Sequence, residues 1–126
     1  MASYVKWFEA AGARVVPVIM GESWDVTLEK LSKLNGIFFP GGDGDFYAWG
    51  KPMFDQVKDY NDLGQIYPMW GTCLGFESMA GWASDLGEPT IGNFVAENIS
   101  MTIDFTVDPR ETKMFSSLGE SAFLYS

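Results

Sequence analysis

The sequence predicts an α/β protein built on a doubly wound, mostly parallel sheet. Apolar residues at helical spacing alternate with short runs rich in β-forming residues, and glycine-rich turns close those runs. Ten Phe, five Trp and five Tyr, within an apolar fraction of 47%, provide enough bulky side chains for a core. Because domains usually have about 150 residues, we expect residues 1–126 to form a single partial domain.

The first predicted element is a helix that begins near Ser3, a suitable N-cap residue, and stops at Gly12. Its apolar positions follow the i, i+3, i+4, i+7 spacing of one helix face. They are Tyr4, Trp7, Phe8 and Ala11.

A strand is predicted next, over Arg14 to Ile19, although Pro17 lacks a ladder donor and suggests an edge strand or a local break. A second helical face follows. The short apolar strand Gly36 to Phe39 ends at the turn Pro40-Gly41-Gly42. The apolar residues of the second helix are Trp24, Leu28, Leu31 and Leu34.

A third, weaker helix is predicted around Phe54, Val57 and Tyr60. The strand Ile66 to Trp70 and a helix over Phe76 to Ala83 complete the alternation. Strand and helix repeating at this pitch are typical of βαβ units and a parallel sheet.

After a loop over Gly87 to Gly92 the pattern changes to strict alternation of apolar and polar residues. Five alternations predict a strand with one buried face, either antiparallel or at a sheet edge. The apolar members are Ile99, Met101, Ile103, Phe105 and Val107.

A doubly wound sheet usually opens with a strand that becomes central. Here the sequence opens with a helix, and a further apolar segment is starting at Phe123-Leu124-Tyr125 when it ends. We therefore expect the first strand and the C-terminal part of the fold to be missing, as in a fragment or one half of a split protein.

Composition excludes several classes of function. Eight basic and seventeen acidic residues give a net charge of −9, which argues against nucleic acid or an anionic membrane as a partner. No apolar run approaches the roughly 20 residues of a membrane span. A single cysteine forms no internal disulfide and leaves the compartment undecided.

The sequence contains no histidine, so these 126 residues cannot supply a Cys-His catalytic pair or a histidine-ligated metal site. We expect neither a metal nor another cofactor. Asp43 and Asp45 are most simply solvated loop carboxylates, and the glycines beside them form no dinucleotide or phosphate-binding motif.

The segment Gly71-Thr72-Cys73-Leu74-Gly75 fits the nucleophile-elbow pattern G-x-nucleophile-x-G, between a predicted strand and a predicted helix. In such a turn a side chain at either glycine position would collide with neighbouring backbone. The helix N-terminus favours a thiolate at Cys73, and the Leu74 amide points to where an oxyanion forms. The alternative is an inert core cysteine.

The turn after the preceding strand is a second candidate. Parallel strands end at a common edge, so the loop at Gly41 and Gly42 is expected beside Cys73, where its amides could complete an oxyanion site. An ordinary turn is the competing interpretation.

Several segments together resemble γ-glutamyl hydrolase, the folate-processing cysteine peptidase with the flavodoxin-like fold of class I glutamine amidotransferases. The resemblance runs in order from about residue 3 to residue 77, and weakly on to Met114-Phe115. The segments are SYVKW (3–7), AGARVVP (11–17), NGI (35–37) with FPGG (39–42), and WGTCLGFE (70–77).

The resemblance implies that Cys73 attacks a γ-glutamyl carbonyl to form a thioester. It implies that the amides of Leu74, Gly41 and Gly42 hold the oxyanion, and that Glu77 helps hold the γ-glutamyl group. The family begins with a strand before the first helix and carries a catalytic His and a Glu beyond the region matched here. A protein partner or a further segment is therefore expected to supply the histidine and the remaining strands.

The family also implies a lysosomal or secreted setting, which the acceptor pattern Asn98-Ile99-Ser100 for N-glycosylation would suit. Two other functions stay open at this point. The chain could be a catalytically inactive structural or binding subunit that kept the fold, or a redox-sensing thiol protein with Cys73 beside Glu77.

Overall fold

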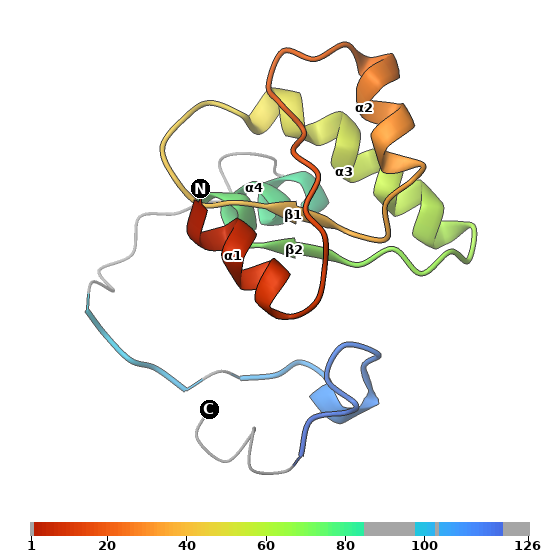
Figure 1. Ribbon diagram of the computed structural model, residues 1–126. Coiled ribbons are helices and arrows are strands. Elements are labelled where there is room, and N and C mark those ends of the chain that lie inside the picture. The colour runs from red at the N-terminus through yellow and green to blue at the C-terminus, as the bar shows by residue number, and fades with distance from the viewer. Residues whose placement is uncertain (1, 85–97, 103, 120–126) are drawn as a thin grey trace. The chain divides into compact units, whose positions relative to one another are not determined.

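The computed structural model describes residues 2–84, 98–102 and 104–119, and the chain falls into two compact units, residues 1–92 and 93–126. The first unit contains four helices and two strands among its described residues (Figure 1). The described part of the second contains a short 3-10 helix, η2 (Pro109–Glu111). The predicted loop Gly87–Gly92 lies outside the described residues.

The sheet of the first unit consists of two parallel strands, β1 (Ile37–Phe39) and β2 (Met69–Gly71). Phe38 lies opposite Trp70 in the register. The long helix α3 (Tyr47–Asp62) connects the strands, so β1, α3 and β2 form a βαβ unit. The prediction of an α/β protein with parallel strands is confirmed at this level.

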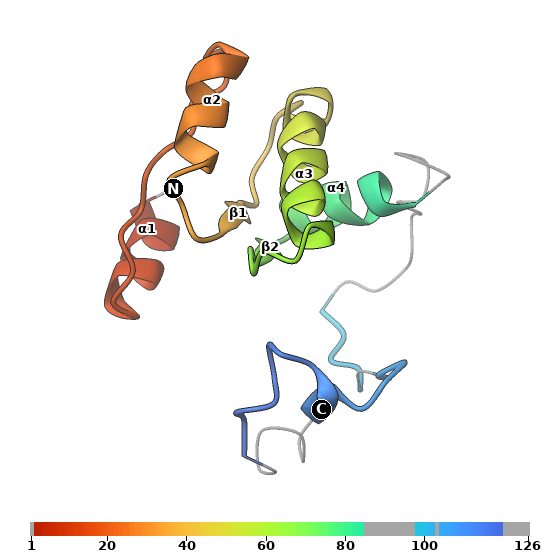
Figure 2. The same ribbon diagram turned by 90° about the vertical axis from the view of Figure 1, so that its right-hand side faces the viewer.

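Helices lie on both sides of this small sheet. On one side α1 (Ala2–Ala10) packs the rings of Tyr4 and Phe8 against Phe38, each with ring centroids 5.0 Å apart. Figure 2 shows α1 and α3 on opposite sides of β1. The remaining helices are α2 (Trp24–Leu31) and α4 (Leu74–Ala83).

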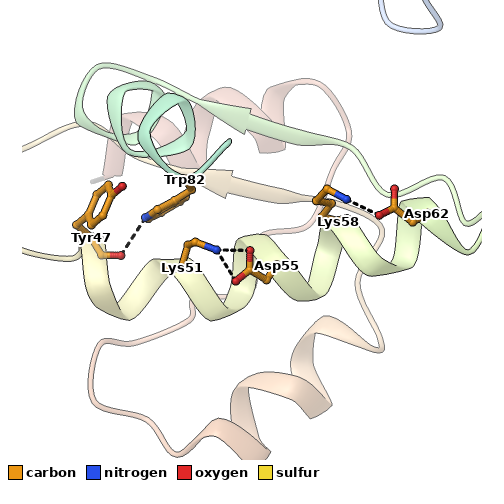
Figure 3. Close-up of polar contacts among 6 residues, drawn as sticks. All are labelled: Tyr47, Lys51, Asp55, Lys58, Asp62 and Trp82. Carbon is orange, nitrogen blue, oxygen red and sulfur yellow. Dashed lines mark hydrogen bonds and ion pairs between the residues drawn. The ribbon is translucent and has the colours of Figure 1, made fainter. Parts of the chain in front are cut away.

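The core lies between the sheet and helices α2, α3 and α4. Trp82 of α4 is central to it: its ring packs edge-on against Phe39, 5.0 Å away, and its indole N–H donates to the Tyr47 carbonyl at 3.1 Å (Figure 3). Burying large aromatic surface in this way is the main source of stability for so small a unit. The buried apolar residues are Leu31, Phe39, Met53, Phe54, Val57, Tyr67 and Trp82.

Helix α3 is longer than the apolar spacing predicted. It begins at Tyr47 and contains Pro52, which has no N–H to donate to the Ala48 carbonyl. The helix tolerates this missing hydrogen bond because Pro52 and Ala48 are both exposed at the surface. Two i,i+4 ion pairs, Lys51–Asp55 and Lys58–Asp62, lie along this helix (Figure 3).

Two predicted strands are wrong for the described residues. Residues 14–19 join no ladder, since Pro17 lacks an amide donor and no neighbouring strand is present in the described part of this unit. Residues 98–102 and 104–108 likewise carry no strand, and Ile99, Met101 and Val107 are exposed. The other differences are small: α1 begins before Ser3, and β2 begins at Met69 rather than at Ile66.

Within the described residues, none of the helices is long and apolar enough to cross a membrane.

Candidate active site

Cys73 occupies the turn between β2 and α4, as the G-x-C-x-G pattern predicts. Its backbone has φ 53° and ψ −120°, a conformation that non-glycine residues rarely adopt and that costs roughly 1–3 kcal/mol. The turn is closed by the Gly75 amide, which donates to the Thr72 carbonyl, and by the Glu77 amide, which donates to the Cys73 carbonyl, both at 3.0 Å. The strained residue is thus fixed in place, with its thiol exposed.

The two flanking glycines are required by close backbone packing. A Cβ added at Gly71 would lie 2.7 Å from the Gly75 carbonyl group, and one added at Gly75 would overlap the Phe39 carbonyl oxygen on β1. The expected collision with neighbouring strand and helix is therefore present. It explains why a side chain occurs at Cys73 but at neither end of the motif.

The loop after β1 reaches the same place. A Cβ added at Gly41 would lie 2.9 Å from the Cys73 Cβ and 3.1 Å from the Thr72 carbonyl oxygen. Gly42 follows with φ +141°, in open space. The carboxyl ends of adjacent parallel strands thus bring the two predicted loops together, and Gly41 allows the close approach.

Leu74 and Glu77 lie in the first turn of α4. Leu74 is the first residue of this helix, where a backbone N–H has no intrahelical acceptor. Glu77 lies one turn after Cys73 and is half-buried. The predicted amide and carboxylate are therefore both carried by the helix end that follows the cysteine.

Sequence reasoning missed Tyr4. Its hydroxyl oxygen lies 3.0 Å from the position of a Gly41 Cβ and the Cys73 Cβ lies 2.9 Å from the same position, so both groups approach that glycine closely. The helical spacing of residues 4–11 assigned Tyr4 only to an apolar face. Tyr4 and Gly41 lie 37 positions apart in the sequence, and no local pattern signals their proximity.

Three further candidates from the sequence are Asn98, Asp43 and Asp45. Asn98 has φ 55° and is exposed in the second unit. Asp43 and Asp45 are exposed in the loop before α3. Among the described residues no group of three or more Cys, Asp or Glu side chains could hold a metal ion.

The chain is similar over nearly its full length to curated γ-glutamyl hydrolases. It is 37% identical over 123 residues to γ-glutamyl hydrolase B of Dictyostelium discoideum, which covers 93% of the chain and 35% of that protein. It is 35% identical over 125 residues to the γ-glutamyl hydrolase of Rattus norvegicus, covering 94% of the chain and 38% of that protein. For the Homo sapiens protein the identity is 38% over 130 residues, covering 98% and 40%.

The chain thus spans between about a third and two fifths of the length of these relatives. No family model matches it, and no solved structure does. The resemblance drawn from four short segments is nevertheless confirmed across nearly the whole chain. Over the segment that it spans, this chain belongs to the γ-glutamyl hydrolase family.

Proposed function

We propose that this chain carries the nucleophile half of a γ-glutamyl hydrolase site that acts on γ-glutamyl peptides of the folyl-polyglutamate type. One observation supports this most: in a chain similar to γ-glutamyl hydrolases, Cys73 has the strained φ of 53° in a strand-to-helix turn, with the Gly41 loop against it. The Cys73 thiolate attacks the γ-carbonyl carbon, a C–S bond forms, and the carbonyl electron pair moves to oxygen. Collapse of this intermediate leaves a thioester.

In this proposal the oxyanion accepts hydrogen bonds from the Leu74 amide at the helix N-terminus and from the amides of the Gly41–Gly42 loop. Such donors stabilise the transition state because they are fixed before charge develops. Glu77, one turn along α4, holds the γ-glutamyl group by pairing its carboxylate with the α-ammonium of the substrate.

The leaving amine must gain a proton, and the sequence contains no histidine. We therefore propose that a histidine beyond these 126 residues, on the same polypeptide or on a partner, acts as general acid and base. The same additional residues would extend the two strands to a doubly wound sheet. No cofactor takes part in this chemistry.

The absence of histidine also favours a second candidate, a structural or binding subunit that has kept the turn but not the activity. Reaction with an activated ester distinguishes the hydrolase proposal from the inactive subunit. With γ-glutamyl p-nitrophenyl ester the leaving phenolate takes its electron pair and needs no proton, so the chain alone should form the thioester. We expect one glutamyl group per chain by intact mass, released by hydroxylamine and absent from Cys73→Ala.

The matched variant Glu77→Gln tests recognition. It should slow acylation by the γ-glutamyl ester at least about tenfold and leave acylation by acetyl p-nitrophenyl ester within about twofold, because only the first donor carries an α-ammonium. A folded chain whose thiol reacts with iodoacetamide but accepts no γ-glutamyl group would refute the hydrolase proposal and leave the subunit.

A further inference from the structure

We propose that the Tyr4 hydroxyl is an additional hydrogen-bond donor of this site, directed at the carbonyl oxygen of the acyl group on Cys73. This inference rests on the proposed function and adds to it a side-chain donor supplied by α1, which no sequence motif indicated. It assigns the N-terminal helix a role in chemistry as well as in packing.

Position is the first argument. The Tyr4 hydroxyl oxygen is 3.0 Å from the point where a Gly41 Cβ would lie, and the Cys73 Cβ is 2.9 Å from the same point. The missing side chain of Gly41 therefore lets a thiol-bearing carbon, a hydroxyl and the Thr72 carbonyl come close together, where a methyl group would not fit. In the proposed thioester the acyl carbonyl forms beside these groups.

Preorganisation is the second argument. The Tyr4 ring packs on Phe38 with centroids 5.0 Å apart and planes at 53°, and Phe8 packs on the same ring. Phe38 in turn lies opposite Trp70 in the ladder that leads to the Cys73 turn. The hydroxyl is thus fixed to the same two strands that carry both loops, as an oxyanion donor must be.

Unused capacity is the third argument. The Tyr4 hydroxyl makes no hydrogen bond to the described part of the chain, whereas the buried Tyr67 hydroxyl donates to the Leu31 carbonyl at 3.1 Å. A phenolic O–H both donates and accepts. When the thiolate attacks, the carbonyl electron pair moves to oxygen, which becomes a stronger hydrogen-bond acceptor. The hydrogen bond from a neutral O–H beside it therefore strengthens, without transfer of the proton.

The test compares two reactions of one thiol in Tyr4→Phe, which keeps the ring on Phe38 and removes only the hydroxyl. Acylation by γ-glutamyl p-nitrophenyl ester develops negative charge on a carbonyl oxygen. Alkylation by iodoacetamide displaces iodide at a saturated carbon and develops none. We expect acylation to slow at least about tenfold, since removing one oxyanion donor commonly costs more than that, while alkylation stays within about twofold.

Tyr60→Phe on α3 is the matched control, because it removes a half-buried tyrosine hydroxyl remote from Cys73 and should change neither rate. Equal loss of both rates in Tyr4→Phe would mean a packing role and overturn the inference, as would unchanged acylation. Both results differ from failure of the proposed function, in which the unaltered chain is alkylated but never acylated.

Discussion

Two apolar runs of this chain, residues 14–19 and residues 36–39, have similar β-forming sequences but different structures. Phe39 is 3% exposed, and β1 forms a ladder with β2 and packs under α3 and α4. Val16 and Ile19 are 44% and 60% exposed, and the Pro17 carbonyl accepts its hydrogen bond from the Lys30 side chain at 2.9 Å. The comparison teaches that a β-forming run becomes a strand only where a neighbouring strand and a covering helix are available.

The largest effect is expected where β1 meets the Cys73 turn. Gly75→Ala places a Cβ on the Phe39 carbonyl oxygen, and neither backbone can move without breaking the ladder. We expect a loss of more than about 3 kcal/mol in the free energy of unfolding, measured by urea denaturation with Trp fluorescence.

Gly64→Ala is the control for that variant. Gly64 has φ +88° and open space around it, so Ala there should cost only about 1 kcal/mol for the left-handed backbone. Similar losses in the two variants would show that β1 and α4 are not in close contact.

The second prediction compares the buried core, represented by Leu31 on α2, with residues 14–19, represented by Ile19, by the same kind of truncation. Leu31→Ala removes a fully buried side chain and should cost about 2–5 kcal/mol. Ile19→Ala removes one that is 60% exposed and should change the free energy of unfolding by no more than about 0.5 kcal/mol. A large loss for Ile19→Ala would mean that residues 14–19 are covered in solution, and the contrast between the two runs would fail.

The sequence predicted those structural features that depend mainly on residues close together in the chain. The turn at Cys73 was predictable because the five-residue G-x-C-x-G pattern is typical of a strand-to-helix turn, although only the Gly71 collision is local and the Gly75 collision is with Phe39 on β1. The parallel strands were predictable because glycine-rich turns separate them from helical faces. Residues 14–19 were predicted wrongly, since their sequence does not show whether a partner strand exists. Tyr4 was missed as a site residue because α1 meets the Gly41 loop only in the folded chain.

A third, smaller effect concerns Tyr67, whose hydroxyl donates to the Leu31 carbonyl. Tyr67→Phe should cost about 1 kcal/mol near neutral pH through loss of this bond. Burial, and secondarily Tyr60, raise the pKa of Tyr67 above its ordinary value. The unfolded chain therefore ionises first as pH rises through about 10, and stability falls there.

Urea denaturation from pH 8 to pH 11 checks this sign. The unaltered chain should lose stability more steeply than Tyr67→Phe at the alkaline end, so the two curves should converge. Parallel curves would mean that the Tyr67 hydroxyl is equally exposed in the folded and unfolded chain, which would contradict its place in the core.

The smallest effect is expected in the second unit, where none of the described residues is buried. Asp108 caps η2: its Oδ1 accepts from the Arg110 amide at 3.0 Å and its Oδ2 from Arg110 Nη2 at 2.6 Å. These bonds lower the pKa of Asp108 to about 2. Because the folded-state pKa is lowered, the contribution is present above the ordinary value of about 4 and is lost as pH falls through about 2.

Carboxyl carbon chemical shifts followed by NMR from pH 6 to pH 1.5 should give Asp108 a midpoint near 2, with the amide of Arg110 shifting in parallel. Asp108→Asn should abolish this titration while keeping a side-chain oxygen for the cap. The global free energy of unfolding of residues 1–92 should not change in that variant, since an exposed pair contributes little. A midpoint near 4 would mean that the Arg110 contacts do not persist in solution, and that even sequence neighbours need packing to hold them.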